Sequence, residues 1–131
     1  MALLTIKNLC IEFPSRHGTE LAVDSVSLDL NPGEILGLVG ESGCGKSTLG
    51  KAICRLLKPT DGEIHFNGQD LGWLSRSAMR PLRRELQNFF QDPVESLNAR
   101  HTVRQILAEP FIIQKMGDST FREKKVKELL D

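Results

Sequence analysis

Residues 40–48 constrain this chain more than any other segment, because they read Gly-Glu-Ser-Gly-Cys-Gly-Lys-Ser-Thr. This stretch fits the phosphate-binding pattern G-x-x-x-x-G-K-[ST] at every position. The glycines Gly40, Gly43 and Gly45 allow the backbone to take positive φ and to approach a ligand closely. Successive N–H groups in such a loop point inward and form a nest for an anion. The segment therefore predicts a loop that holds phosphate groups.

The side chains of this loop predict how a nucleotide and its metal would be held. Lys46 is expected to reach the β- and γ-phosphates, and the Ser47 hydroxyl is expected to ligate the Mg²⁺ that bridges them. A helix that begins near Ser47 would direct the positive end of its dipole at the same phosphates. The other binding positions of the loop, besides its glycines, are Glu41, Ser42, Cys44 and Thr48.

The flanks of the loop favour the same interpretation. Residues 34–39 form a short apolar run that predicts a buried parallel strand. Downstream, a helix is predicted to end before Pro59, which cannot continue it. One face of that helix would carry Leu49, Ile53, Leu56 and Leu57. A chance match in an unrelated loop would not be expected to combine a strand before it with a helix after it.

Composition sets limits on the class of protein. With 131 residues and 40% hydrophobic residues, the chain can bury one modest core as one domain or part of one. Seventeen basic and seventeen acidic residues balance, so no overall field favours nucleic acid. No signal peptide is predicted, and no run reaches the roughly 20 apolar residues of a membrane span. Three cysteines without metal-binding spacing indicate reduced thiols in the cytoplasm.

Alternating apolar residues predict further strands. In residues 23–30, Val26, Leu28 and Leu30 lie on one face. A polar loop is expected at 14–20, and Asn67–Gly68 is a favoured tight-turn pair. The expected strands are 4–13, 23–30, 63–66 and a core strand at 86–91.

Helical spacing predicts three helices besides the one after the loop, at 75–85, 102–109 and 120–131. The first carries four arginines, which a solvated helix face explains better than a nucleic-acid surface. In the last, Val126, Leu129 and Leu130 share a face. Lys124 and Glu128 have the spacing of a stabilising ion pair.

Several separated blocks resemble the ATP-binding subunits of ABC transporters, most closely the dipeptide, oligopeptide and nickel importer branch. The blocks are 26–34 leading into the loop, 59–71, Phe90-Gln91-Asp92-Pro93, 96–100 and 103–110. Ala99 stands where that branch usually has proline. The resemblance implies an α/β fold, namely an ABC-type P-loop NTPase core with an N-terminal antiparallel β subdomain, truncated in the helical subdomain. Its expected parts are a β-rich entry at 1–33, the P-loop core up to the Q-loop at 34–93, and the start of the helical subdomain at 94–131.

The resemblance also implies residue roles. Gly40–Thr48 would hold the triphosphate of ATP. Gln91, in the Q-loop, would contact Mg²⁺ or the attacking water and relay the state of the nucleotide to a membrane subunit. Phe13 would stack on the adenine, although a plain core position explains it equally well. The scattered His17, His65 and His101 are expected to be structural.

The family completes its site with a Leu-Ser-Gly-Gly-Gln signature, a Walker B strand that ends in Asp-Glu, and a switch histidine; none occurs in this sequence. Without them the chain is expected to bind nucleotide but not to hydrolyse it alone. The implied partners are transmembrane permease subunits, a second ABC ATPase subunit and, indirectly, an extracytoplasmic solute-binding protein, at the cytoplasmic face of the inner membrane.

Two hypotheses remain open. The chain is the amino-terminal part of an ATPase that powers peptide or nickel import, or it is a non-hydrolytic nucleotide-binding or interaction fragment, or a truncated inactive gene product. A small P-loop kinase is a weaker third possibility, because the strand-rich segment before Gly40 and the block around Gln91 both argue against it. The sequence does not identify the transported solute.

Overall fold

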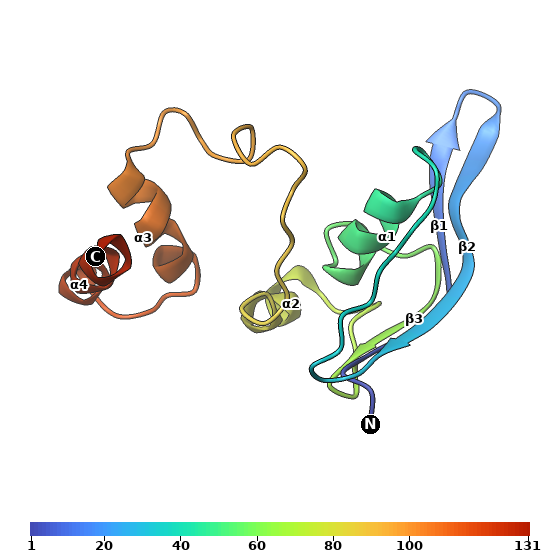
Figure 1. Ribbon diagram of the computed structural model, residues 1–131, viewed down its shortest axis with the longest axis horizontal. Helices are drawn as coiled ribbons and strands as arrows, with labels where there is room; N and C mark the ends of the chain where they lie inside the picture. Colours follow the sequence, from blue (N-terminus) through green and yellow to red (C-terminus); the bar gives the residue numbers. More distant parts are fainter. The chain divides into compact units, whose positions relative to one another are not determined.

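The computed structural model describes residues 1–131, which form two compact units, Met1–Asn88 and Phe89–Asp131. Figure 1 shows the elements of both. None of the helices combines the length and the apolar composition that crossing a bilayer requires.

The first unit is built on an antiparallel sheet of four strands. The strands β1 (Leu4–Ser15) and β2 (Gly18–Leu30) form a long hairpin, and β3 (Asp61–Phe66) pairs with the other edge of β1. The short β4 (Gln69–Asp70) completes the order β2-β1-β3-β4. The predicted strands at 4–13, 23–30 and 63–66 are therefore confirmed.

The predicted loop at 14–20 is longer than the loop in the structure, so this prediction is wrong in extent. Pro14 pairs with Thr19 and Ser15 pairs with Gly18, so the hairpin closes within two residues. The polar composition of this segment reflects an exposed hairpin end, where both faces of the two strands meet solvent.

A β-bulge in β1 explains how its apolar residues reach one face. Leu4, Ile6, Leu9 and Ile11 are all buried. In a regular strand, successive side chains point to opposite faces, so Leu9 and Ile11 would face away from the core if Leu4 and Ile6 face it. The register shifts between Ile6 and Leu9, and Asn8 there takes a left-handed conformation with φ 46°. An extra residue in one strand returns the following side chains to the core face. Without the bulge, the second half of β1 would point its apolar residues at solvent.

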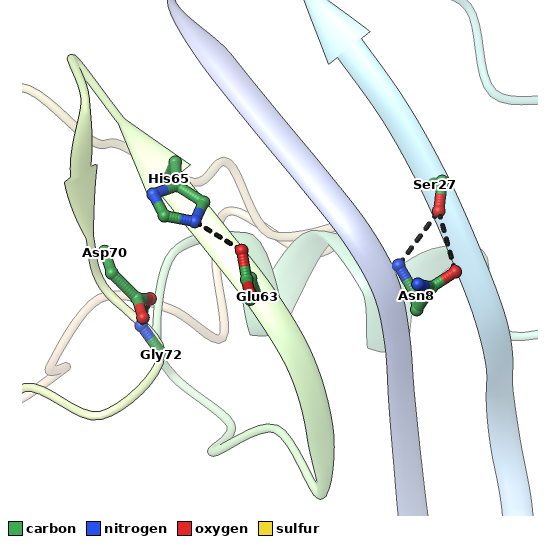
Figure 2. Close-up of polar contacts among 6 residues, drawn as sticks. All are labelled: Asn8, Ser27, Glu63, His65, Asp70 and Gly72. Atoms are coloured by element: carbon green, nitrogen blue, oxygen red, sulfur yellow. Dashed lines mark hydrogen bonds and ion pairs between the residues drawn. The ribbon is translucent and has the colours of Figure 1, made fainter.

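Side chains fix this irregularity. The Asn8 backbone N–H donates a hydrogen bond to Ser27 Oγ on β2 at 2.9 Å (Figure 2). Asn is one of the few residues besides Gly that adopts the left-handed conformation readily.

The turn between β3 and β4 confirms the Asn67–Gly68 prediction. Asn67 has φ 49° and Gly68 has φ 78°, as a primed hairpin turn requires. At the end of β4, the Asp70 carboxylate accepts a hydrogen bond from the Gly72 N–H at 2.8 Å (Figure 2).

Two helices complete the core of the first unit. Helix α1 (Lys46–Ile53) buries Leu49 and Ala52, and Figure 1 shows it beside the β1–β2 hairpin. Helix α2 (Arg76–Leu82) begins at the N-cap Ser75 and buries Met79. Val26, Leu28 and Leu30 pack against this core, which confirms their predicted common face. The buried cluster consists of Leu4, Ile6, Leu9, Ile11, Val23, Leu49, Ala52, Ile64, Phe66, Leu71 and Met79.

Helix α1 is shorter than predicted. It ends at Ile53, well before Pro59, because Arg55 turns into the left-handed conformation with φ 54°. Leu56 consequently leaves the helical face and is exposed, whereas Leu49 remains buried.

The apolar segments 34–39 and 86–91 are not strands, contrary to prediction. Ile35 is 97% exposed, Val39 96% and Phe89 94%, and neither segment is hydrogen-bonded into the sheet. An apolar run becomes a buried strand only where neighbouring strands satisfy its backbone and other layers cover its faces. The four strands of this sheet pair with one another and leave both segments outside it.

The second unit is a pair of helices, α3 (Val103–Ile113) and α4 (Ser119–Leu130). Phe111 and Phe121 meet edge to face with ring centroids 6.4 Å apart. Arg104 and Glu123 form an ion pair at 2.6 Å. Contacts between helices therefore hold this unit together.

The predicted apolar face of α4 is only partly buried. Val126 is 3% exposed, but Leu129 and Leu130 are each 61% exposed. The ion pair on this helix joins Lys125, not Lys124, to Glu128 at 2.8 Å, because positions three residues apart also lie side by side on a helix.

Candidate nucleotide phosphate site

The loop 40–48 leads directly into α1, and Gly45 is the N-cap of that helix. Gly45 has φ 100°, and a Cβ there would collide with the backbone oxygen of Ala22 on β2. The loop thus lies against the hairpin so closely that only glycine fits. This contact fixes the start of α1 on the sheet.

The other two glycines of the pattern differ from each other. Gly43 also has positive φ, as predicted, whereas Gly40 does not. At Gly40 an added Cβ would lie 2.5 Å from Cys44 Sγ, the end of the side chain across the loop, so the Cys44 side chain would have to move.

The first turn of α1 presents unsatisfied donors. Gly45 offers no side-chain oxygen, so no side chain caps the helix, and the first turn contains no acidic residue. The first N–H groups of a helix have no partner within the helix and carry the positive end of its dipole. The hydroxyl groups of Ser47 and Thr48 make no hydrogen bond within the protein. This end of α1 can therefore accept an anion and offers a hydroxyl to a metal.

Lys46 crosses the loop to which it belongs. Its Nζ donates hydrogen bonds to the carbonyl oxygens of Gly40 at 2.5 Å and Glu41 at 2.7 Å, and lies 3.5 Å from Cys44 Sγ. Bonds from an ammonium group are stronger than bonds between neutral partners. The positive charge is thus held beside the backbone donors.

Phe13 lies on the same hairpin that the loop contacts. It is 38% exposed on β1 and pairs with Glu20 of β2, two residues before Ala22. Its ring is therefore neither a full core residue nor freely solvated. Gln91 belongs to the second unit, where its side chain is exposed.

The histidines and cysteines form no metal centre, since no three His, Cys, Asp or Glu side chains group closely enough. His65 instead lies 2.7 Å from a carboxylate oxygen of Glu63 on the same strand (Figure 2). Burial raises the pKa of the Cys54 thiol, and the nearby Arg83 opposes that shift. Cys54 is therefore held in its neutral form at neutral pH.

Sequence reasoning missed one polar feature, the role of Arg83. It was predicted to lie on a solvated helix face, but its guanidinium group donates to the carbonyl oxygens of Cys54 at 3.1 Å and Arg55 at 3.0 Å. These bonds satisfy carbonyl groups at the end of α1. The signal was weak, because nothing in the spacing of the arginines distinguishes Arg83 from its exposed neighbours Arg76 and Arg84.

Comparison with known proteins identifies the class. Residues 23–131 match the family model described as ABC transporter, and the chain belongs to this family. The first unit with its loop and uncapped helix is accordingly part of an ABC-type P-loop fold, which confirms the predicted fold class.

Individual relatives support this assignment. The chain is 50% identical over 90% of its length to the oligopeptide transport ATP-binding protein AppF of Bacillus subtilis, and 49% identical over 98% to OppF of the same organism. It covers 36% and 43% of those proteins, so it spans less than half the length of these relatives.

A solved structure supports the fold independently. The dimeric structure of MJ0796, a bacterial ABC transporter cassette, superposes with a TM-score of 0.82 at 26% identity. The match covers 97% of this chain and 54% of that one. A second structure, the ATP-binding cassette MJ0796 in a post-hydrolysis state bound to ADP and Pi, gives a TM-score of 0.79 over 95% of this chain.

Proposed function

We propose that this chain binds the phosphates of ATP or ADP, with Mg²⁺, through residues 40–48. The observation that carries the proposal is the uncapped first turn of α1 directly after the loop, with the Lys46 ammonium held alongside. Backbone donors, a helix dipole and a fixed cation act on the same small region, and together they suit a polyphosphate.

Each side chain then has a defined task. Lys46 would hold the β- and γ-phosphates, and the Ser47 hydroxyl would ligate the Mg²⁺ that bridges them. Phe13 stacks against the adenine from the hairpin that contacts the loop, a role suited to its half-exposed ring.

In the cell, we propose that the chain serves as the nucleotide-binding part of a peptide importer at the cytoplasmic face of the membrane. The support is its identity to AppF and OppF, both described as oligopeptide transport ATP-binding proteins. Its partners are permease subunits and a second ABC ATPase subunit. Because its sequence contains no Walker B or signature residues, the chain alone binds nucleotide without steady turnover.

Calorimetric titration with ATP and Mg²⁺ tests the binding. Lys46→Ala should weaken affinity about ten- to a hundredfold, since a charge-assisted contact contributes about 1.5–3 kcal/mol. Lys51→Ala is the matched control, because Lys51 is exposed on the same helix outside the loop. The Lys51→Ala variant should bind ATP with unchanged affinity. Equal affinity of the Lys46→Ala and unmodified chains would refute the proposal.

A further inference from the structure

A second cationic site lies in the first unit, beyond the end of α1. A hollow of about 550 Å³ there is lined by four basic side chains over apolar ones. No acidic side chain lines it. The basic residues are Arg55, Lys58, Arg76 and Arg83, and the apolar wall includes Leu74 and Met79.

Two of the four cations are fixed in place. Arg55 donates from Nε to the Leu71 carbonyl oxygen at 2.7 Å and from Nη2 to that of Leu74 at 3.0 Å. Arg83 donates to the carbonyl oxygens of Cys54 and Arg55. These acceptors are neutral, so they orient the guanidinium groups without neutralising them. Each group also retains N–H donors that have no protein partner.

The two guanidinium groups repel each other. Burial lowers the pKa of Arg55, the nearby Arg83 lowers it further, and Asp70 acts in the opposite direction. The Asp70 carboxylate already accepts the Gly72 N–H and is not among the residues that line the hollow. Two partly buried like charges without a counter-ion between them make a favourable position for an anion.

The other two cations stand at the exposed rim. The Lys58 ammonium lies 5.5 Å from the centroid of the Trp73 ring, within the range of a cation–π contact. Arg76 begins α2, and neither its side chain nor that of Lys58 makes a hydrogen bond within the protein. Both can therefore turn toward a ligand in the hollow.

We propose that this hollow binds the phosphoryl group of a phosphate-bearing anion, at a site separate from residues 40–48. Arginine presents paired donors that match phosphate oxygens, and four cations suit a group of more than one negative charge better than a single carboxylate. The phosphoryl group can belong to a free phosphate compound or to a lipid headgroup, and the two sources are separable by experiment.

The test uses the full chain carrying Lys46→Ala, so that the loop 40–48 does not dominate binding. Inorganic pyrophosphate is titrated calorimetrically at about 50 mM salt, where screening is modest, and again at high salt. Pyrophosphate should bind, acetate should bind at least about tenfold more weakly, and salt should weaken both. Absence of pyrophosphate binding at low salt would overturn the proposal.

Substitutions locate the binding. The double variant Lys58→Gln with Arg76→Gln removes two rim charges that make no internal hydrogen bonds, so the fold should be retained. Its pyrophosphate affinity should fall by at least about tenfold. Arg84→Gln, an exposed arginine outside the hollow, is the matched control and should bind normally. Equal affinity of the double variant and the control would overturn the proposal.

Vesicle sedimentation identifies the source of the phosphoryl group. Vesicles of phosphatidylcholine with phosphatidylinositol phosphate should retain the chain if the headgroup is the ligand, and the double variant should abolish retention. If pyrophosphate binds and these vesicles do not, the site is one for a free phosphate compound. If the double variant still binds the vesicles, a lipid headgroup is not the ligand of this hollow.

Discussion

Gly62 on β3 lies opposite the bulge in β1, and the two features depend on each other. Gly62 has φ +91°, and a Cβ there would collide with the carbonyl oxygen of Asn8 and lie 2.7 Å from Leu9 Cα. The colliding atoms are backbone and cannot move aside without disturbing the strand pairing. The bulge that turns Leu9 toward the core is therefore possible only because its neighbour has no side chain.

We predict that Gly62→Ala destabilises the chain by at least about 2 kcal/mol, from left-handed strain and backbone collision together. Gly50→Ala is the contrasting control, because Gly50 lies within α1 with open space around its Cα. It should stabilise the chain by up to about 1 kcal/mol through helix propensity. Urea unfolding of both variants measures the difference, and equal stabilities would contradict the role of Gly62.

Among the helices, α3 shows most clearly how a few neighbouring residues determine where a helix begins. Thr102 accepts a hydrogen bond from the Gln105 N–H at 3.3 Å, and the Gln105 side chain accepts one from the Thr102 N–H at 2.8 Å. This reciprocal pair is a capping box and fixes where the helix begins. The threonine and glutamine three residues apart mark this start in the sequence itself.

Thr102→Ala should lower the stability of the helix pair in the second unit by about 1 kcal/mol, because it leaves the first-turn N–H groups of α3 uncapped. Circular dichroism at 222 nm during thermal unfolding detects the loss of helix. Thr120→Ala is the matched control, since Thr120 is an exposed residue inside the first turn of α4, which Asp118 caps. A larger effect at Thr120 than at Thr102 would refute the capping role.

For the molecule as a whole, the exposed apolar segment 34–39 is the most consequential feature. Ile35 and Val39 are almost fully exposed directly before the loop 40–48. Neighbouring apolar side chains exposed in this way favour association between molecules. They contribute no core packing in the first unit.

We expect the double variant Ile35→Thr with Val39→Thr to remain folded and to associate less. Light scattering at rising concentration should show less self-association than in the unmodified chain, with an unchanged thermal midpoint. A midpoint that falls by about 4 °C or more, equivalent to about 1 kcal/mol in a domain of this size, would show that these side chains are packed in solution.

The sequence by itself determined the features that depend on local chemistry. The loop 40–48, the turn at Asn67–Gly68 and the existence of most helices and strands follow from residue type and spacing, because φ preference, capping and apolar periodicity act over a few residues. Family membership was predictable for the same reason, since its motifs are short and contiguous.

Only the tertiary structure decided the rest. Segments 34–39 and 86–91 have strand-like composition, yet no neighbouring strand satisfies their backbone, and so they stay outside the sheet. The bulge at Asn8, the end of α1 at Ile53 and the bonds from Arg83 to the end of that helix also depend on distant residues. Pairing and burial are properties of two segments at once, and a pattern within one segment cannot specify them.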